Sequence, residues 1–121
     1  MITLVLPYPP SINHYWRRVG NQTLLSRDGR AFRDRVIETV FLAGRKPPIE
    51  GEIAVSLFAY PPDQRRRDID NLIKSTLDAL EHAGVYRDDF QVADLSITRR
   101  HCVSGGKIVV NIKTYIPEVT Q

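Results

Sequence analysis

The 121-residue chain contains a single cysteine and no long apolar run. One cysteine, Cys102, cannot form a disulfide within the chain, which is typical of a reducing compartment. We expect it to be a small buried residue of a strand. No stretch approaches the roughly eighteen apolar residues of a membrane span, and the segment after Met1 does not resemble a signal peptide. These absences predict a cytoplasmic protein without a membrane partner.

Several catalytic motifs are also absent. The histidines at positions 14, 82 and 101 lack the spacing of zinc ligands and have no cysteine partners. The chain has no glycine-rich phosphate loop and no nucleophile elbow. A nucleotide cofactor, nucleotide hydrolysis and acyl-enzyme chemistry are therefore poor candidates, and each histidine is best interpreted as a surface or packing residue.

The composition is that of one ordinary globular domain spanning residues 1–121, with 42% hydrophobic and 26% charged residues. The formal net charge is +3. Basic residues dominate up to position 48, whereas acidic residues concentrate between positions 50 and 94. A basic rim around an acidic pocket suits an enzyme that acts on nucleic acid, although ordinary surfaces often show similar unevenness.

The most informative segment is RRRDIDNLIK at residues 65–74, which two further aspartates, Asp88 and Asp89, follow. Helical periodicity from Ile69 to Ala83 gives one apolar face, and it places Asp70, Lys74 and Glu81 together on the other. Gly84 is a typical helix stop. The predicted helix therefore has one face for the core and one charged stripe.

Asp68 and Asp70 point to the same side if the chain between them is extended. Either aspartate is also a favoured helix cap, and this simpler interpretation stays open. Asp89 can rejoin the pair only if the chain doubles back along a strand. Together the three carboxylates would repel one another, and a magnesium ion would remove that conflict. Lys74 would then stabilise charge on a phosphodiester under attack.

Residues 7–22 are expected to form a long loop without regular structure, because the segment has three prolines and no period. Its aromatic and cationic side chains at positions 15–18 suit base stacking and phosphate contact. Anchoring of Tyr15 and Trp16 on the core is an equally good interpretation.

Strands are predicted near residues 2–6, 53–58, 93–98 and 108–112, and helices near 28–43 and 69–83. The glycines at 105 and 106 are expected to close a hairpin between the last two strands. The predicted fold class is α/β (α+β): a small mixed four-stranded sheet with two helices packed on it, in the order β-α-β-α-β-β.

The segment RRRDIDNLIKSTLDAL with the later Asp-Asp pair, together with LPYPPSIN near the start and SGGK near the end, resembles the RusA family of Holliday-junction resolvases over nearly the whole chain. The resemblance implies a magnesium-dependent endodeoxyribonuclease, with Mn²⁺ a possible substitute. Such an enzyme cuts four-way junction DNA by paired nicks during recombination and repair. Because two symmetric cuts need two active sites, a homodimer is implied. A bacterial or prophage-encoded cytoplasmic enzyme is expected.

The same resemblance implies that Asp68, Asp70 and Asp89 hold the metal and that Lys74 is their catalytic partner, with Asp88 as an auxiliary carboxylate. Candidate DNA-binding residues lie in the proline-rich loop and around the arginines: Ser11, Asn13, His14, Arg17, Arg65, Arg66, Arg67 and Asn71. Two alternatives stay open. The protein could bind branched or duplex DNA without cutting it, or it could be a metal-dependent nuclease without a preference for junctions.

Overall fold

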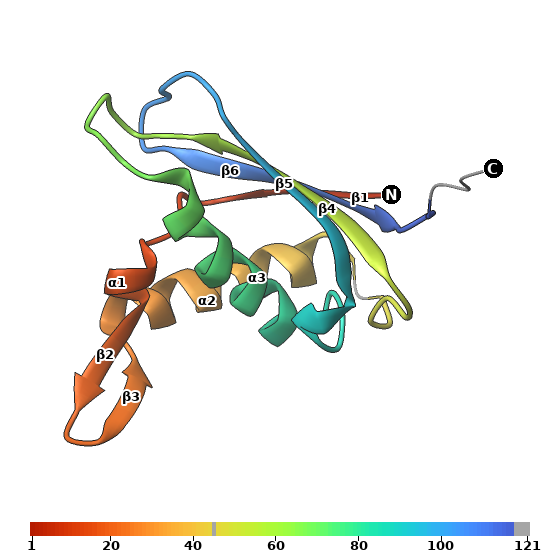
Figure 1. Cartoon of the computed structure of the whole chain (residues 1–121), viewed down its shortest axis with the longest axis horizontal. Coiled ribbons are helices and arrows are strands. Elements are labelled where there is room, and N and C mark those ends of the chain that lie inside the picture. The colour runs from red at the N-terminus through yellow and green to blue at the C-terminus, as the bar shows by residue number, and fades with distance from the viewer. Residues whose placement is uncertain (45, 118–121) are drawn as a thin grey trace.

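The computed structural model describes residues 1–44 and 46–117, and its centre is a four-stranded mixed sheet (Figure 1). The strands lie in the order β1 (Ile2–Leu6), β6 (Lys107–Thr114), β4 (Ile53–Tyr60) and β5 (Val92–Arg99). β4 and β5 are parallel, whereas β6 is antiparallel to both β1 and β4. The predicted sheet is confirmed.

Two helices, α2 (Arg27–Leu42) and α3 (Ile73–His82), lie on the same side of this sheet (Figure 1). α2 begins where Ser26 caps it, since the Ser26 hydroxyl accepts a hydrogen bond from the Gly29 N–H. The predicted helix from 69 to 83 is instead a 3₁₀ turn, η1 (Ile69–Leu72), followed by α3. Gly84, with φ +80°, ends it as expected.

The core lies between the sheet and the helices. Alternate side chains of β4, from Ile53 to Ala59, are almost completely buried. Those of Ile53, Val55 and Leu57 form one cluster with Leu80 of α3 and Val36 of α2. Each fully buried aliphatic side chain of this kind contributes about 1.5–3 kcal/mol. The alternating pattern of β4 was therefore a reliable signal, because one face of the sheet is covered and the other is not.

The predicted hairpin between the last two strands is wrong, because β4 lies between β5 and β6. The loop at residues 100–106 instead crosses the end of β4. There the Arg100 N–H donates to the Ala59 carbonyl at 2.8 Å, and the Val103 N–H donates to the Pro61 carbonyl at 3.0 Å. Cys102 lies in this loop and is exposed, so its predicted burial in a strand is also wrong.

The predicted irregular loop at residues 7–22 contains regular structure. A short helix, α1 (Ile12–Tyr15), leads into a hairpin of β2 (Trp16–Val19) and β3 (Gln22–Leu25), which projects away from the sheet (Figure 1). Tyr15 is completely buried and Trp16 is half-buried, which favours the anchoring interpretation for both rings. These elements are too short to show a period in the sequence.

Gly29, in the first turn of α2, allows α1 to pack closely. A methyl group at this position would overlap the carbonyl oxygen of Tyr15 and crowd the side chains of Leu25 and Ser26. The end of α1 is therefore in direct contact with the α2 backbone.

Among the described residues, none of the helices is both long enough and apolar enough to cross a membrane.

Candidate nucleic-acid interface and active site

Asp68 and Asp70 lie on the exposed rim between β4 and α3. Asp68 occupies the N-cap position of η1 in an extended backbone conformation (φ −87°, ψ 123°), but its side chain makes no capping hydrogen bond. Asp70 follows in the first turn of η1. Among the described residues, neither carboxylate takes part in an ion pair or in a side-chain hydrogen bond. The simple capping interpretation therefore does not explain this aspartate pair.

Lys74 of α3 and Asp89, in the turn just before β5, form an ion pair. The Lys74 ammonium lies 2.7 Å from Asp89 Oδ2, and the hydrogen bond that it donates to this carboxylate raises the pKa of Lys74. The Asp89 N–H donates to Glu81 Oε1 at 2.8 Å. The chain thus does fold back, so that the residues just before β5 lie against the charged stripe of α3.

Three carboxylates gather at this place: Glu81, Asp88 and Asp89 each offer an oxygen, and these oxygens lie within 4.8 Å of one another. Asp68 and Asp70 are not members of this group. Glu81 was not among the predicted site residues, although its position on the same helix face as Asp70 and Lys74 was the signal that could have found it.

Asp88 has a local structural role. It caps a 3₁₀ turn, η2 (Asp89–Gln91), by accepting a hydrogen bond from the Phe90 N–H at 2.9 Å, while the Gln91 side chain accepts one from the Asp88 N–H at 3.0 Å. Carboxylate oxygens are the donors that a hard divalent cation prefers, so the acidic residues of this rim fit magnesium in type. The convergence of Asp68, Asp70 and Asp89 on one ion stays a prediction.

A pocket next to Asp68 joins two segments that are far apart in the sequence. It is lined by Tyr8, Pro9, Pro10, Ser11, His14, Arg66, Arg67, Asp68, Asn71 and Leu72. Five of the predicted DNA-binding residues are therefore neighbours of a predicted metal ligand. The Ser75 hydroxyl of α3 donates to the Pro10 carbonyl at 2.9 Å and holds the proline-rich segment in place.

The remaining predicted DNA-binding residues lie outside this pocket. Asn13 is exposed on α1, and Arg17 is exposed on the projecting hairpin. Arg65 lines a second pocket on the other side of Asp68. Arg67, which lines both pockets, pairs with Asp63 at 2.6 Å. This hydrogen bond lowers the pKa of Asp63 to about 2.

α1 is fixed by a hydrogen-bonded network beneath it. The Tyr15 hydroxyl and the Arg33 guanidinium both donate to Asp78 Oδ2 of α3, Arg33 at 2.7 Å. Burial by itself raises the pKa of Asp78, but these two hydrogen bonds outweigh it and the pKa lies below its ordinary value. The segment that carries Ser11 and His14 is thereby held in position relative to α3.

The family profile described as Endodeoxyribonuclease RusA matches residues 7–113, which include both pockets and the acidic rim. The chain belongs to the RusA endodeoxyribonuclease family. It is 40% identical over 108 residues to the crossover junction endodeoxyribonuclease of Enterobacteria phage HK97, covering 89% of this chain and 90% of the relative. It is 36% identical over 110 residues to the enzymes of that name from Shigella sonnei and Escherichia coli K12, covering 91% of this chain and 92% of each relative.

Membership of the RusA family confirms the resemblance and the prediction of an endodeoxyribonuclease. The names of these relatives also connect the family with crossover junctions, that is, with branched DNA.

Proposed function

We propose that this protein is a magnesium-dependent, structure-selective endodeoxyribonuclease that resolves four-way DNA junctions by paired symmetric nicks. One observation carries the proposal: Asp68 and Asp70, the acidic pair of the family motif, form no ion pair within residues 1–44 and 46–117 and lie on an exposed rim beside the pocket that contains Ser11 and Asn71. Carboxylates without a structural partner next to a basic surface are suited to a cation and a phosphodiester.

Asp68, Asp70 and Asp89 would hold the ion, and Glu81 and Asp88 lie beside Asp89 as further carboxylate donors. Bound magnesium supplies neutralisation of phosphate charge and a more acidic bound water, and Mn²⁺ has a similar preference for oxygen ligands. The carboxylates also repel a phosphate backbone that enters without a cation, so DNA cleavage requires the metal.

Lys74 acts on the phosphodiester itself. Its ammonium group is half-exposed and within reach of Asp89, and its raised pKa keeps it charged at neutral pH. A fixed positive charge at this place stabilises the negative charge that develops on the phosphorane or on the leaving oxygen.

DNA is bound on both sides of the acidic rim by Ser11, Asn13, His14, Arg17, Arg65, Arg66, Arg67 and Asn71. Paired cuts in opposing strands require two active sites, so the working enzyme is a homodimer with a two-fold axis. Relatives from bacteria and their phages support a reaction in the bacterial cytoplasm, in recombination and repair.

The deciding experiment measures nicking of a synthetic, mobile four-way junction while magnesium is titrated. We expect symmetric nicks that require the metal, and we expect Asp70→Asn to lower the cleavage rate by roughly 10²-fold or more while junction binding persists. Asp94→Asn, an exposed carboxylate on β5, is the matched control and should cleave normally.

Two results would contradict the proposal. Binding without cleavage at any metal concentration would favour a DNA-binding protein whose acids are structural. Loss of junction binding upon addition of excess linear duplex would favour a nuclease without junction preference, since a resolvase keeps its affinity for the junction in that competition.

A further inference from the structure

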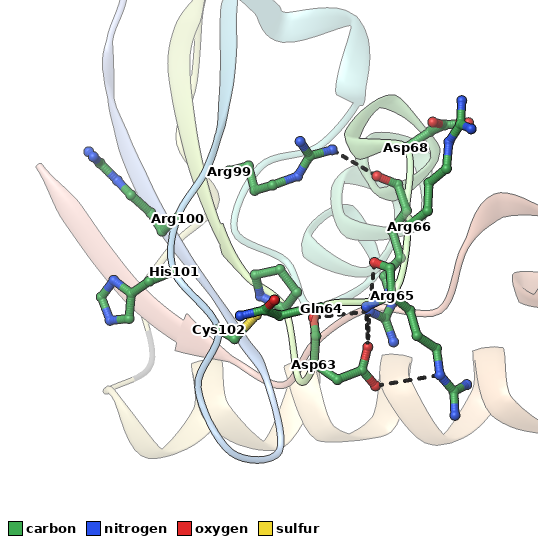
Figure 2. A pocket seen from close by; sticks show the side chains of 11 residues that line it. Asp63, Gln64, Arg65, Arg66, Asp68, Arg99, Arg100, His101 and Cys102 are labelled. Atoms are coloured by element: carbon green, nitrogen blue, oxygen red, sulfur yellow. Dashed lines mark hydrogen bonds and ion pairs between the residues drawn. The ribbon is translucent and has the colours of Figure 1, made fainter.

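The second pocket beside Asp68 has two walls of different origin. In Figure 2 the Arg99 side chain reaches toward the loop of residues 65–67, whereas the Arg100 and His101 side chains point away from it. The first wall is the loop of Arg65, Arg66 and Arg67, which already carries predicted DNA contacts. The second wall is the loop after β5, and its residues Arg99, Arg100, His101 and Cys102 belong to no predicted site. The pocket has a volume of about 490 Å³.

The lining of this pocket is strongly basic. Five arginines face two aspartates, Asp63 and Asp68. Asp63 is already paired, with Arg67 at 2.6 Å and with Arg65 at 3.9 Å. Among the described residues, Arg66, Arg99 and Arg100 form no ion pair. Guanidinium groups without an acidic partner on one part of a surface favour a polyanion.

The second wall is held in a fixed arrangement. Arg99 Nη2 donates to the Arg67 carbonyl at 2.8 Å, which ties the two walls together (Figure 2). The Arg100 guanidinium lies over the Phe58 ring at 5.0 Å from its centroid. Both contacts leave other guanidinium N–H groups available, because arginine has five donors. Pre-positioned forks of this kind match the geometry of phosphate oxygens.

Asp68 lines both pockets, and so do Arg66 and Arg67. A nucleic-acid strand that passes Asp68 therefore leaves one pocket and enters the other. On one side it meets Ser11, His14 and Asn71, and on the other side it meets the second wall.

We propose that Arg99, which reaches from the second wall toward the arginine loop, binds a backbone phosphate of the DNA strand on the far side of Asp68 from the proline-rich segment. This inference rests on the proposed function and deepens it, because it extends the DNA-binding surface to a loop outside the segment RRRDIDNLIK. The ligand is a phosphodiester chain, which is distinct from free phosphate.

The first test measures the affinity for a four-way junction without divalent ions, so that cleavage does not interfere, over a series of salt concentrations. Arg99→Ala should weaken binding and reduce the slope of log K against log salt concentration by about one phosphate contact. Arg99→Lys should restore most of the slope. Arg35→Ala, an exposed arginine of α2 that does not line the pocket, is the matched control and should bind as the unmodified protein does.

The second test uses Cys102, the only cysteine of the chain, which is exposed in the pocket lining. The rate of its reaction with a thiol reagent is measured alone, with junction DNA and with inorganic phosphate. We expect DNA to slow the reaction and phosphate to leave it unchanged. This readout is independent of cleavage and of any substitution.

An unchanged salt slope in Arg99→Ala, or a Cys102 thiol that DNA does not protect, would overturn the assignment of Arg99. Protection by inorganic phosphate without protection by DNA would also overturn it and would indicate a small-anion site. In each of these cases, metal-dependent junction cleavage by the unmodified protein would leave the proposed function standing.

Discussion

Two ion pairs on α3 have the same length but very different surroundings. Arg33 and Asp78 lie 2.7 Å apart with side chains that are 20% and 13% exposed, whereas Lys74 and Asp89 lie 2.7 Å apart with side chains that are 52% and 29% exposed. The first pair connects three helices through Tyr15, and the second connects α3 only with the turn before β5. The distance between the charged atoms therefore does not distinguish a pair that stabilises the fold from the pair that we propose to act in catalysis.

Burial makes the difference. Water and salt screen the Lys74–Asp89 pair, so it contributes little to stability and its ammonium is available to substrate. The Asp78 carboxylate accepts two hydrogen bonds in a largely dry place, where the loss of either partner leaves an uncompensated group. The inner side of α3 thus holds the segment of the predicted DNA-binding residues in position, and the outer side carries the lysine that we propose to act in catalysis.

Removal of the buried carboxylate should have the largest effect on stability. Asp78→Ala leaves the Arg33 charge and the Tyr15 hydroxyl without their partner, and we expect the free energy of unfolding to fall by about 3 kcal/mol. Urea denaturation measures this change. Asp94→Ala, an exposed carboxylate on β5, should change it by less than about 0.5 kcal/mol. Equal effects of the two substitutions would remove the distinction between the two ion pairs.

Acid should reveal the same network. Tyr15, Arg33 and His82 all face Asp78, and its pKa lies below the ordinary 3.8. A depressed pKa contributes stability that is fully present above pH 4 or so and is lost as the pH falls through the folded value. Between about pH 5 and about pH 2, the free energy of unfolding of the unmodified protein should therefore fall by more than that of Asp78→Ala. Parallel pH profiles would contradict this.

The exposed pair should show the opposite balance. Lys74→Ala should lower the free energy of unfolding by less than about 1 kcal/mol, because solvent screens its pair with Asp89. It should nevertheless slow junction cleavage while metal binding is retained. Denaturation, metal titration and single-turnover cleavage of the same preparation separate these effects. Unchanged turnover would remove the lysine from the mechanism.

The smallest effect is expected for Arg87, which pairs with Glu50 at 2.9 Å where both side chains are mostly exposed. Arg87→Ala should change the free energy of unfolding by less than about 0.5 kcal/mol and leave cleavage unaltered. A larger loss in thermal or urea denaturation would show that exposure is a poor guide to the value of these pairs.

The regular part of the fold could be predicted from the sequence because its signals are local. Alternation along β4 and the serine cap of α2 each identify one element without knowledge of the rest. The family motif likewise indicated the acidic rim and Lys74. These predictions depend on spacing within a few residues, which short-range geometry determines.

The remaining features depend on contacts between distant segments. The insertion of β4 between β5 and β6 is decided by strand pairing, and the turn at Gly105 and Gly106 specifies a reversal without specifying neighbours. The arginine pocket likewise arises only because the loop after β5 crosses the end of β4. The role of Asp78 was invisible, because only packing of three helices brings Tyr15 and Arg33 to it.

The close packing at Gly29 has a consequence for how this enzyme can change. Since any side chain larger than hydrogen would strike the Tyr15 carbonyl, substitution there would displace α1 together with the hairpin that follows it. Such a change would alter the position of the predicted DNA-binding residues of α1 and the hairpin without removing a charged group. The position of this segment thus depends on the Cβ atom that Gly29 lacks.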